Sequence, residues 1–120
     1  MAQFSAADPI VILSYARTPM GGFMGDFSET NAVSLGATAI AAAVERAGLS
    51  NDQVDDLVMG CVLQAGQGQA PGRQAALAAG LAQSTQCLTI NKMCGSGMKA
   101  MMIVHDGLAL GHSTVGLAGG

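Results

Sequence analysis

Short apolar runs and longer helical repeats alternate along the sequence. Residues 10–13 (Ile-Val-Ile-Leu) form a continuous apolar, β-branched run, which is typical of a strand buried on both faces of a parallel sheet. The glycines at positions 21, 22 and 25 predict a loop after this strand. Apolar residues then recur with a helical period, which predicts a helix that Gly48 ends. Its apolar positions are Val33, Ala37, Ile40, Val44 and Ala47.

The rest of the sequence repeats this alternation. Its patterns predict strands at about 56–63, 87–91 and 114–118, and helices at about 73–81 and 95–110. Pro71 suits the first turn of the earlier helix, because the N–H that proline lacks is not used there. The later helix is apolar around nearly its whole circumference, which indicates that it is covered on more than one side. The alternating order predicts an α/β fold with a mainly parallel sheet and right-handed crossovers.

The composition fits one core of small aliphatic side chains. Half of the 120 residues are hydrophobic but only 3% are aromatic, so Ala, Leu, Val, Ile and Met must fill the core. Charged residues make up only 11%, and the mean hydropathy is +0.41, which leaves little polar surface to cover an independent domain. We therefore expect part of the surface to be buried against further protein, and the chain to be a truncated beginning of a longer one.

Charge and cysteine content exclude several classes of protein. The net charge is −3, and the five basic residues are scattered rather than gathered into a stripe that could bind nucleic acid. The sequence starts without a basic leader and contains no apolar run long enough to span a membrane, so we expect a cytoplasmic protein. The three cysteines, Cys61, Cys87 and Cys94, lack C-x-x-C spacing, which argues against a disulfide framework and against a zinc or other metal site.

Cys94 is the candidate nucleophile. It stands where a predicted strand passes into a predicted helix, and the free N–H groups of a helix N-terminus favour a thiolate. Gly95 and Gly97 beside it would let a bulky substrate approach the sulfur. A small buried apolar side chain is an equally good interpretation of this cysteine from position alone. Ser96 is expected to form hydrogen bonds in the helix turn rather than to take part in chemistry.

Three segments resemble the thiolase family, in the right order along the chain. Residues 91–100 (Asn-Lys-Met-Cys-Gly-Ser-Gly-Met-Lys-Ala) resemble its active-site segment, residues 17–21 its first loop, and residues 66–76 its second. Together they span nearly the whole chain. The resemblance implies the layered αβαβα fold of that family, of which residues 1–120 would be a partial N-terminal domain without the loop domain and the C-terminal domain.

The resemblance also implies an acetyl-CoA acetyltransferase. Cys94 would take the acyl group from one coenzyme A thioester and condense it with a second acetyl-CoA to acetoacetyl-CoA, or carry out the reverse thiolysis. The backbone N–H of Cys94 would serve as an oxyanion donor. Coenzyme A and acetyl-CoA would be substrates, with no tightly bound cofactor, and the complete enzyme would be a homodimer or homotetramer. Residues that bind coenzyme A cannot be named from this segment.

The base and a second reactive cysteine should come from outside this sequence. In thiolases they belong to His-Pro and Cys-Gly-Gly motifs, which do not occur here. At about 1.5 Å per residue, a continuous helix would place His105 roughly 16 Å from Cys94, and His112 farther still. Cys61 and Cys87 lie in strand patterns and are expected in the core. We therefore expect the 120-residue chain alone to be inactive.

Two other interpretations remain open. Gly66 and Gly68 suggest a nucleotide-binding loop, although Pro71 stands where the third glycine of that motif belongs. The chain could also be a non-catalytic interaction subunit with the thiolase fold, completed by another chain.

Overall fold

The computed structural model of the chain describes residues 8–120, in which helices and strands alternate. The elements, in chain order, are α1 (Ala32–Arg46), β1 (Asp56–Gly60), α2 (Pro71–Ala78), β2 (Gln86–Ile90), α3 (Ser96–Ala109) and β3 (Gly116–Gly119). The predicted α/β class is confirmed. No helix in the described part of the chain has the length and apolarity that a membrane crossing requires.

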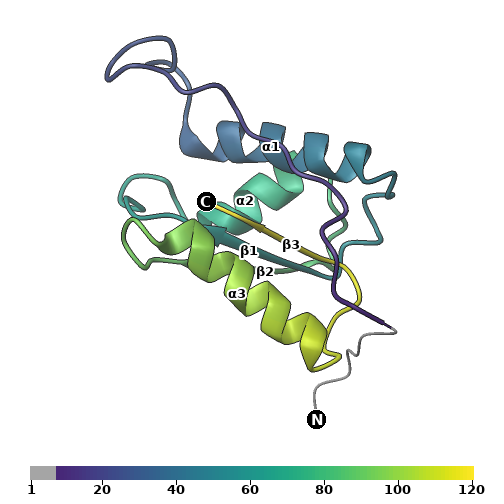
Figure 1. Ribbon diagram of the computed structural model, residues 1–120. Coiled ribbons are helices and arrows are strands. Elements are labelled where there is room, and N and C mark those ends of the chain that lie inside the picture. Colours follow the sequence, from purple (N-terminus) through teal and green to yellow (C-terminus); the bar gives the residue numbers. More distant parts are fainter. Residues whose placement is uncertain (1–7) are drawn as a thin grey trace.

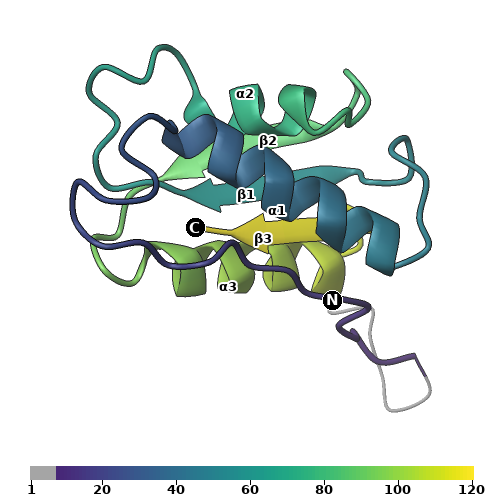
Figure 2. The same ribbon diagram turned by 90° about the horizontal axis from the view of Figure 1, so that it is seen from above.

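The three strands form a parallel sheet in the order β2-β1-β3. Leu57 in the central strand is in register with Cys87 of β2 and with Leu117 of β3. The arrows in Figure 2 point the same way, and the C-terminus follows the head of β3. The chain moves one way along the sheet from β1 to β2 and back past β1 to β3. Because right-handed crossovers in opposite directions lie on opposite faces, α2 and α3 cover different sides of the sheet.

Each face of the sheet has its own core. Leu57 points to the face that α1 and α2 cover, where it packs in a buried cluster with Ile40, Val44 and Ala76. Val58 points to the other face and packs in a second buried cluster with Ala100 and Val104 of α3. This alternation follows from the two-residue period of a strand, and Figure 1 shows the resulting three layers. Burying one such aliphatic side chain contributes about 1.5–3 kcal/mol.

The predicted helix signals are confirmed. Gly48 follows α1 with φ +69°, and the N–H of Leu49 reaches back to the carbonyl of Val44 at 3.2 Å, as in a helix end closed by a left-handed glycine. At the other end of α1, the side chain of Asn31 accepts a hydrogen bond from the N–H of Ser34 at 2.8 Å. Pro71 is the first residue of α2, two residues before the predicted start, and the helix ends at Ala78 rather than near residue 81.

The strand predicted at residues 10–13 is wrong. These residues form no strand in the structure, and the side chains of Val11, Ile12 and Leu13 are 62%, 79% and 58% exposed. An apolar, β-branched run favours a strand but does not provide a hydrogen-bonding partner, and both edges of the central strand β1 are taken by β2 and β3. The segment instead runs beside α1, where the hydroxyl of Ser14 donates to the carbonyl of Ala43 at 2.6 Å.

Within the described residues α3 is covered on one side only, so they do not provide the second cover expected from its apolar circumference. Ala100 and Val104 face the sheet, but Met98, Met101 and Met102 are 69%, 57% and 50% exposed. One sheet can cover only one side of a helix, and this helix is apolar on the opposite side as well. Exposed apolar patches of this kind commonly mark a surface that another part of a protein covers.

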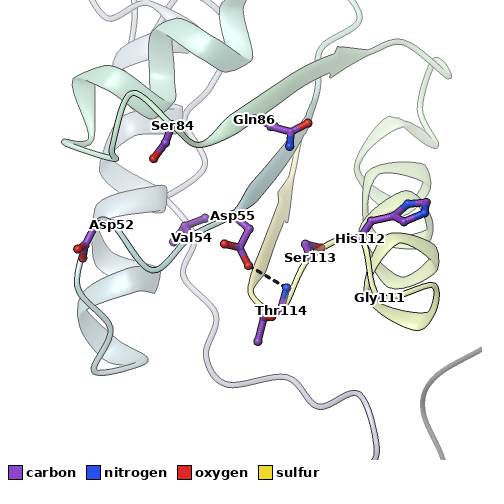
Figure 3. Close-up of a pocket in the computed structure, with 9 residues that line it drawn as sticks. All are labelled: Asp52, Val54, Asp55, Ser84, Gln86, Gly111, His112, Ser113 and Thr114. Carbon is purple, nitrogen blue, oxygen red and sulfur yellow. Dashed lines mark hydrogen bonds between the residues drawn. The ribbon is translucent and has the colours of Figure 1, made fainter.

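Asp55 joins the amino ends of the three strands. Its carboxylate oxygen Oδ2 accepts hydrogen bonds from the N–H groups of Thr114 and Val115 at 2.8 and 3.0 Å, one of which is drawn in Figure 3. Its backbone carbonyl accepts from the N–H of Gln86 at 2.9 Å. The N–H groups of Val115 and Thr114 hold the pKa of this carboxyl below its ordinary value, against a smaller opposing effect of burial.

Asp55→Asn should therefore destabilise the protein in a pH-dependent way. A carboxyl whose folded pKa is lowered stabilises the fold above its unfolded pKa, about 3.9, and loses that contribution as the pH falls through the folded pKa. Because the carboxylate is exposed to water, we expect the melting temperature of the variant at pH 7 to be only about 2–4 °C below that of the wild type. Thermal unfolding at pH 7 and below pH 3 measures the difference, which should be smaller at the lower pH. An equal difference at both pH values would contradict this role.

Candidate active site

The link between β2 and α3 lies at the carboxyl edge of the sheet. In open parallel sheets, ligands bind outside this edge, where neighbouring connections leave toward opposite faces. Here the connection after β1 leads to α2 and the connection after β2 leads to α3, on the other face. Cys94 lies in the second of these connections and is exposed. The predicted position of Cys94 between a strand and a helix is thus confirmed.

A tight turn presents Cys94 just before the helix. Met93 has a left-handed backbone with φ +47°. The N–H of Gly95 donates to the carbonyl of Lys92, and the N–H of Ser96 donates to the carbonyl of Met93, both at 3.0 Å. Gly95 is the N-cap of α3, and no side chain caps the helix there. Cys94 therefore precedes the N-cap, beside the positive end of the helix dipole.

The side chain of Asn91 links the Cys94 turn to the loop after β1. Its side-chain oxygen accepts a hydrogen bond from the N–H of Met93 at 2.9 Å. Its amide nitrogen donates to the carbonyl of Val62 at 3.3 Å, so that one side chain connects the Cys94 turn to the loop after β1. The sequence contains Asn91 in the thiolase-like segment, but only the structure shows this bridging role.

Gly60 allows the start of α3 to lie directly on the end of β1. A Cβ atom at this position would lie 2.6 Å from the Cβ of Ser96, 2.8 Å from its backbone carbon and 2.9 Å from the backbone nitrogen of Gly97. Distances this short are not possible between real atoms, and two of the three involve backbone that cannot rotate away. Only glycine fits at position 60, and the contact fixes the first turn of α3 relative to the sheet.

A side chain of α2 holds the glycine-rich loop that precedes this helix. Gly66 and Gly68 have φ values of +79° and +78°, and the amide nitrogen of Gln74 donates to the carbonyls of Gln67 and Gln69, each at 2.8 Å. These bonds give the loop a fixed shape next to the Cys94 turn, to which Asn91 connects it.

The start of α2 is a poor phosphate site. Pro71 has no N–H, and the N–H of Gly72 donates to the hydroxyl of Thr89 at 2.9 Å. A phosphate at a helix N-terminus needs such N–H groups free. This arrangement weakens the interpretation of the chain as a nucleotide-binding module.

The other residues named from the sequence lie away from Cys94 or are partly buried. His105, exposed and 3.3 Å from the carboxylate of Asp106, lies in the C-terminal half of α3. Cys87 is partly buried and packs against the core cluster of Leu57. Cys61 is partly buried one residue beyond β1, and its sulfur accepts a hydrogen bond from the amide of Gln67 at 3.5 Å. Within residues 8–120, no group of three or more His, Cys, Asp or Glu side chains could hold a metal ion.

A hollow lies at the opposite, amino edge of the sheet. It has a volume of about 310 Å³ and is lined by polar residues that include Asp55, Gln86 and His112 (Figure 3). Its position at the strand starts separates it from the Cys94 turn by the length of the sheet. His112 therefore lies at the wrong end of the molecule to act on Cys94.

The fold and the exposed thiol define an α/β protein with a candidate nucleophile at the carboxyl edge of a parallel sheet. A family model described as "Thiolase, N-terminal domain" matches residues 10–120. The chain therefore belongs to the thiolase family, as the resemblance in the sequence predicts.

Relatives and a solved structure agree with this assignment. The mitochondrial acetyl-CoA acetyltransferase of Xenopus tropicalis is 58% identical over 111 residues, which are 92% of this chain and 26% of that protein. The human mitochondrial acetyl-CoA acetyltransferase is 52% identical with the same coverage. The structure of the Acat5 thiolase from Ascaris suum in complex with coenzyme A matches with a TM-score of 0.84 and 36% identity, over 85% of this chain and 27% of that one. The chain thus spans about a quarter of the length of the curated relatives it matches.

The expectation of a cytoplasmic protein is contradicted by these relatives. The acetyl-CoA acetyltransferases of Xenopus tropicalis, cattle and humans that the chain matches are all named as mitochondrial, which points to the mitochondrion rather than the cytoplasm. The signals that direct a protein to the mitochondrion lie in removable targeting segments and not in the folded domain. Composition and charge of a folded domain therefore could not supply the compartment.

Gly60→Ala should disrupt the contact between β1 and α3. The added methyl group must displace the backbone of Ser96 and Gly97, and overpacking of this kind costs about 1–3 kcal/mol. Gly22→Ala is the matched control, because a Cβ there meets nothing within 4 Å and should change the free energy of unfolding by less than about 0.5 kcal/mol. Urea denaturation of both variants measures the two costs. Equal stability of the two variants would show that the close approach at Gly60 is not a constraint.

Proposed function

We propose that this chain is the nucleophile-bearing part of an acetyl-CoA acetyltransferase, in which Cys94 forms the acyl-enzyme. The observation that carries the proposal is the position of Cys94, exposed on a tight turn at the carboxyl edge of the sheet, directly before α3. The names of the relatives and the coenzyme A bound to the Ascaris suum thiolase support coenzyme A thioesters as substrates.

The proposed reaction has two halves. In the first, the thiolate of Cys94 attacks the carbonyl carbon of acetyl-CoA, the bond from that carbon to the coenzyme A sulfur breaks, and coenzyme A leaves as a thiol after gaining a proton. In the second, a base removes a proton from the α-carbon of another acetyl-CoA. That carbon then attacks the acyl group, so that the Cys94 sulfur is released and acetoacetyl-CoA forms. In the reverse direction, the Cys94 thiolate attacks the β-carbonyl carbon of acetoacetyl-CoA, the bond between the α- and β-carbons breaks, and acetyl-CoA leaves after its α-carbon gains a proton. The thiolate of coenzyme A then attacks the acetyl group on Cys94 and releases the cysteine sulfur.

The turn supports the proposed oxyanion donor. The N–H groups of Met93, Gly95 and Ser96 are occupied by hydrogen bonds within the turn, and that of Lys92 is occupied by the hydroxyl of Ser96. These bonds hold the backbone on both sides of Cys94, whose own N–H is the proposed donor. A donor fixed beside the nucleophile by its neighbours can stabilise the charge that develops on the substrate oxygen.

Residues 1–120 would be a partial N-terminal domain of this enzyme. The exposed methionines of α3, Met98, Met101 and Met102, provide an apolar surface that the loop domain and the C-terminal domain could cover. His105 and His112 lie toward the opposite end of α3 from Cys94, so the base that the chemistry requires would come from those parts, and the 120-residue chain would be inactive alone. Assembly into a homo-oligomer belongs to the same proposal.

Cys94→Ala in the complete enzyme should abolish thiolysis of acetoacetyl-CoA. Removal of a covalent nucleophile costs on the order of 10³-fold or more in turnover. Cys61→Ala and Cys87→Ala are control variants, because each removes a partly buried thiol, one directly after β1 and one in β2, and both should retain most of the activity. The assay follows the loss of acetoacetyl-CoA by its absorbance. Activity that survives Cys94→Ala would refute the proposal.

A further inference from the structure

The hydroxyl of Ser96 closes the turn that carries Cys94. Its oxygen accepts a hydrogen bond from the N–H of Lys92 at 2.9 Å and donates its proton to the carbonyl of Met93 at 2.5 Å. The side chain is at the first position of α3 and only 4% of the residue is exposed. One hydroxyl therefore bonds to the backbone on both sides of the turn, and its proton and a lone pair are in use.

Met93, directly before the nucleophile, has a backbone that its own side chain does not favour. A φ of +47° is uncommon for residues other than glycine and asparagine and strains the backbone of a methionine. The Met93 side chain is 72% exposed, so packing does not hold it in place. Hydrogen bonds hold the Met93 backbone instead. The side chain of Asn91 accepts one from the N–H of Met93, and the hydroxyl and N–H of Ser96 both donate to the carbonyl of Met93.

Ser96 is itself fixed by the sheet. The approach of Gly60 to the Cβ and backbone of Ser96 leaves no room for the first turn of α3 to shift toward β1. A continuous chain of contacts thus runs from the end of β1 through Ser96 to the carbonyl of Met93. This carbonyl and the N–H of Cys94 belong to the same peptide group.

We propose that Ser96 is a positioning residue for Cys94: its hydroxyl holds Met93 in the left-handed conformation and thereby sets the direction of the Cys94 thiol and N–H. This inference rests on the proposed function, because it concerns acyl transfer to Cys94. Ser96 touches no reacting atom in this role. Its proton is already donated to the carbonyl of Met93, and only 4% of the residue is exposed.

The test is the rate constant for acyl-enzyme formation, measured by rapid mixing of the complete enzyme with acetyl-CoA and quantification of acetyl-Cys94 by mass spectrometry. This constant does not depend on the fraction of protein that is correctly folded. Ser96→Ala should lower it about 10- to 100-fold, the effect of misplacing a reacting group by a small distance. The acetyl-CoA concentration that gives half the maximal rate should stay the same, because binding is not affected.

Ser113→Ala is the matched control. The Ser113 hydroxyl is also buried, but it has no hydrogen-bond partner among the described residues, and it lines the hollow at the opposite edge of the sheet. This substitution removes the same atoms without removing a bond, and it should leave the acylation rate constant unchanged. A rate constant in Ser96→Ala equal to those of the wild type and Ser113→Ala would overturn the inference.

Substitution of Met93 tests the same idea without changing Ser96. Met93→Val places a β-branched residue where φ is positive and should slow acylation, whereas Met93→Gly accepts this conformation and should leave the rate within about twofold of the wild type. In the Ser96→Ala background, Met93→Gly should restore part of the lost rate. Equal rates for the Val and Gly variants, or no restoration in the double variant, would refute the positioning role. Absence of acetyl-Cys94 in the wild type would instead refute the proposed function itself.

Discussion

The contact between the end of β1 and the start of α3 is the constraint on which the rest of this structure depends. Gly60 leaves space for the backbone of Ser96 and Gly97 to lie directly against the sheet. Because α3 is fixed at this point, its first turn, the hydrogen bonds of Ser96 and the position of Cys94 are fixed with it. The absence of a side chain at position 60 thus determines where the candidate nucleophile lies.

The two edges of the sheet have different roles. At the amino edge, the carboxylate of Asp55 holds the start of β3 beside β1, and its contribution is to stability. At the carboxyl edge, the connections leave toward opposite faces, and the Cys94 turn lies between them. This division follows from the parallel sheet, in which all strands end at one edge and begin at the other. The right-handed crossovers then carry successive connections from the carboxyl edge to opposite faces.

Much of this fold could be predicted from the sequence because its helices and most of its strands have regular apolar periods. The end of α1 at Gly48, the start of α2 at Pro71 and the position of Cys94 between a strand and a helix all have local signals. The failure at residues 10–13 has a different origin. An apolar run indicates a preference for burial, but it does not show which strand it pairs with, because strand pairing depends on residues far apart in the chain.

Three features of the site had no local signal. Gly60 resembles any glycine at a strand end, and its close approach to Ser96 becomes visible only in three dimensions. The left-handed backbone of Met93 and the bridge that Asn91 makes to Val62 depend on groups from different elements. The candidate nucleophile could therefore be predicted from the sequence, whereas the contacts around it become visible only in the structure.

The most direct measurement of the central claim is the location of the acyl group on the complete enzyme. The protein would be incubated with acetyl-CoA, quenched in acid, digested, and its cysteine-containing peptides analysed by mass spectrometry. The account predicts a single acetyl group on the peptide that contains Cys94, which coenzyme A removes when it is added before the quench. Acetylation of Cys61 or Cys87 with Cys94 unmodified would contradict it.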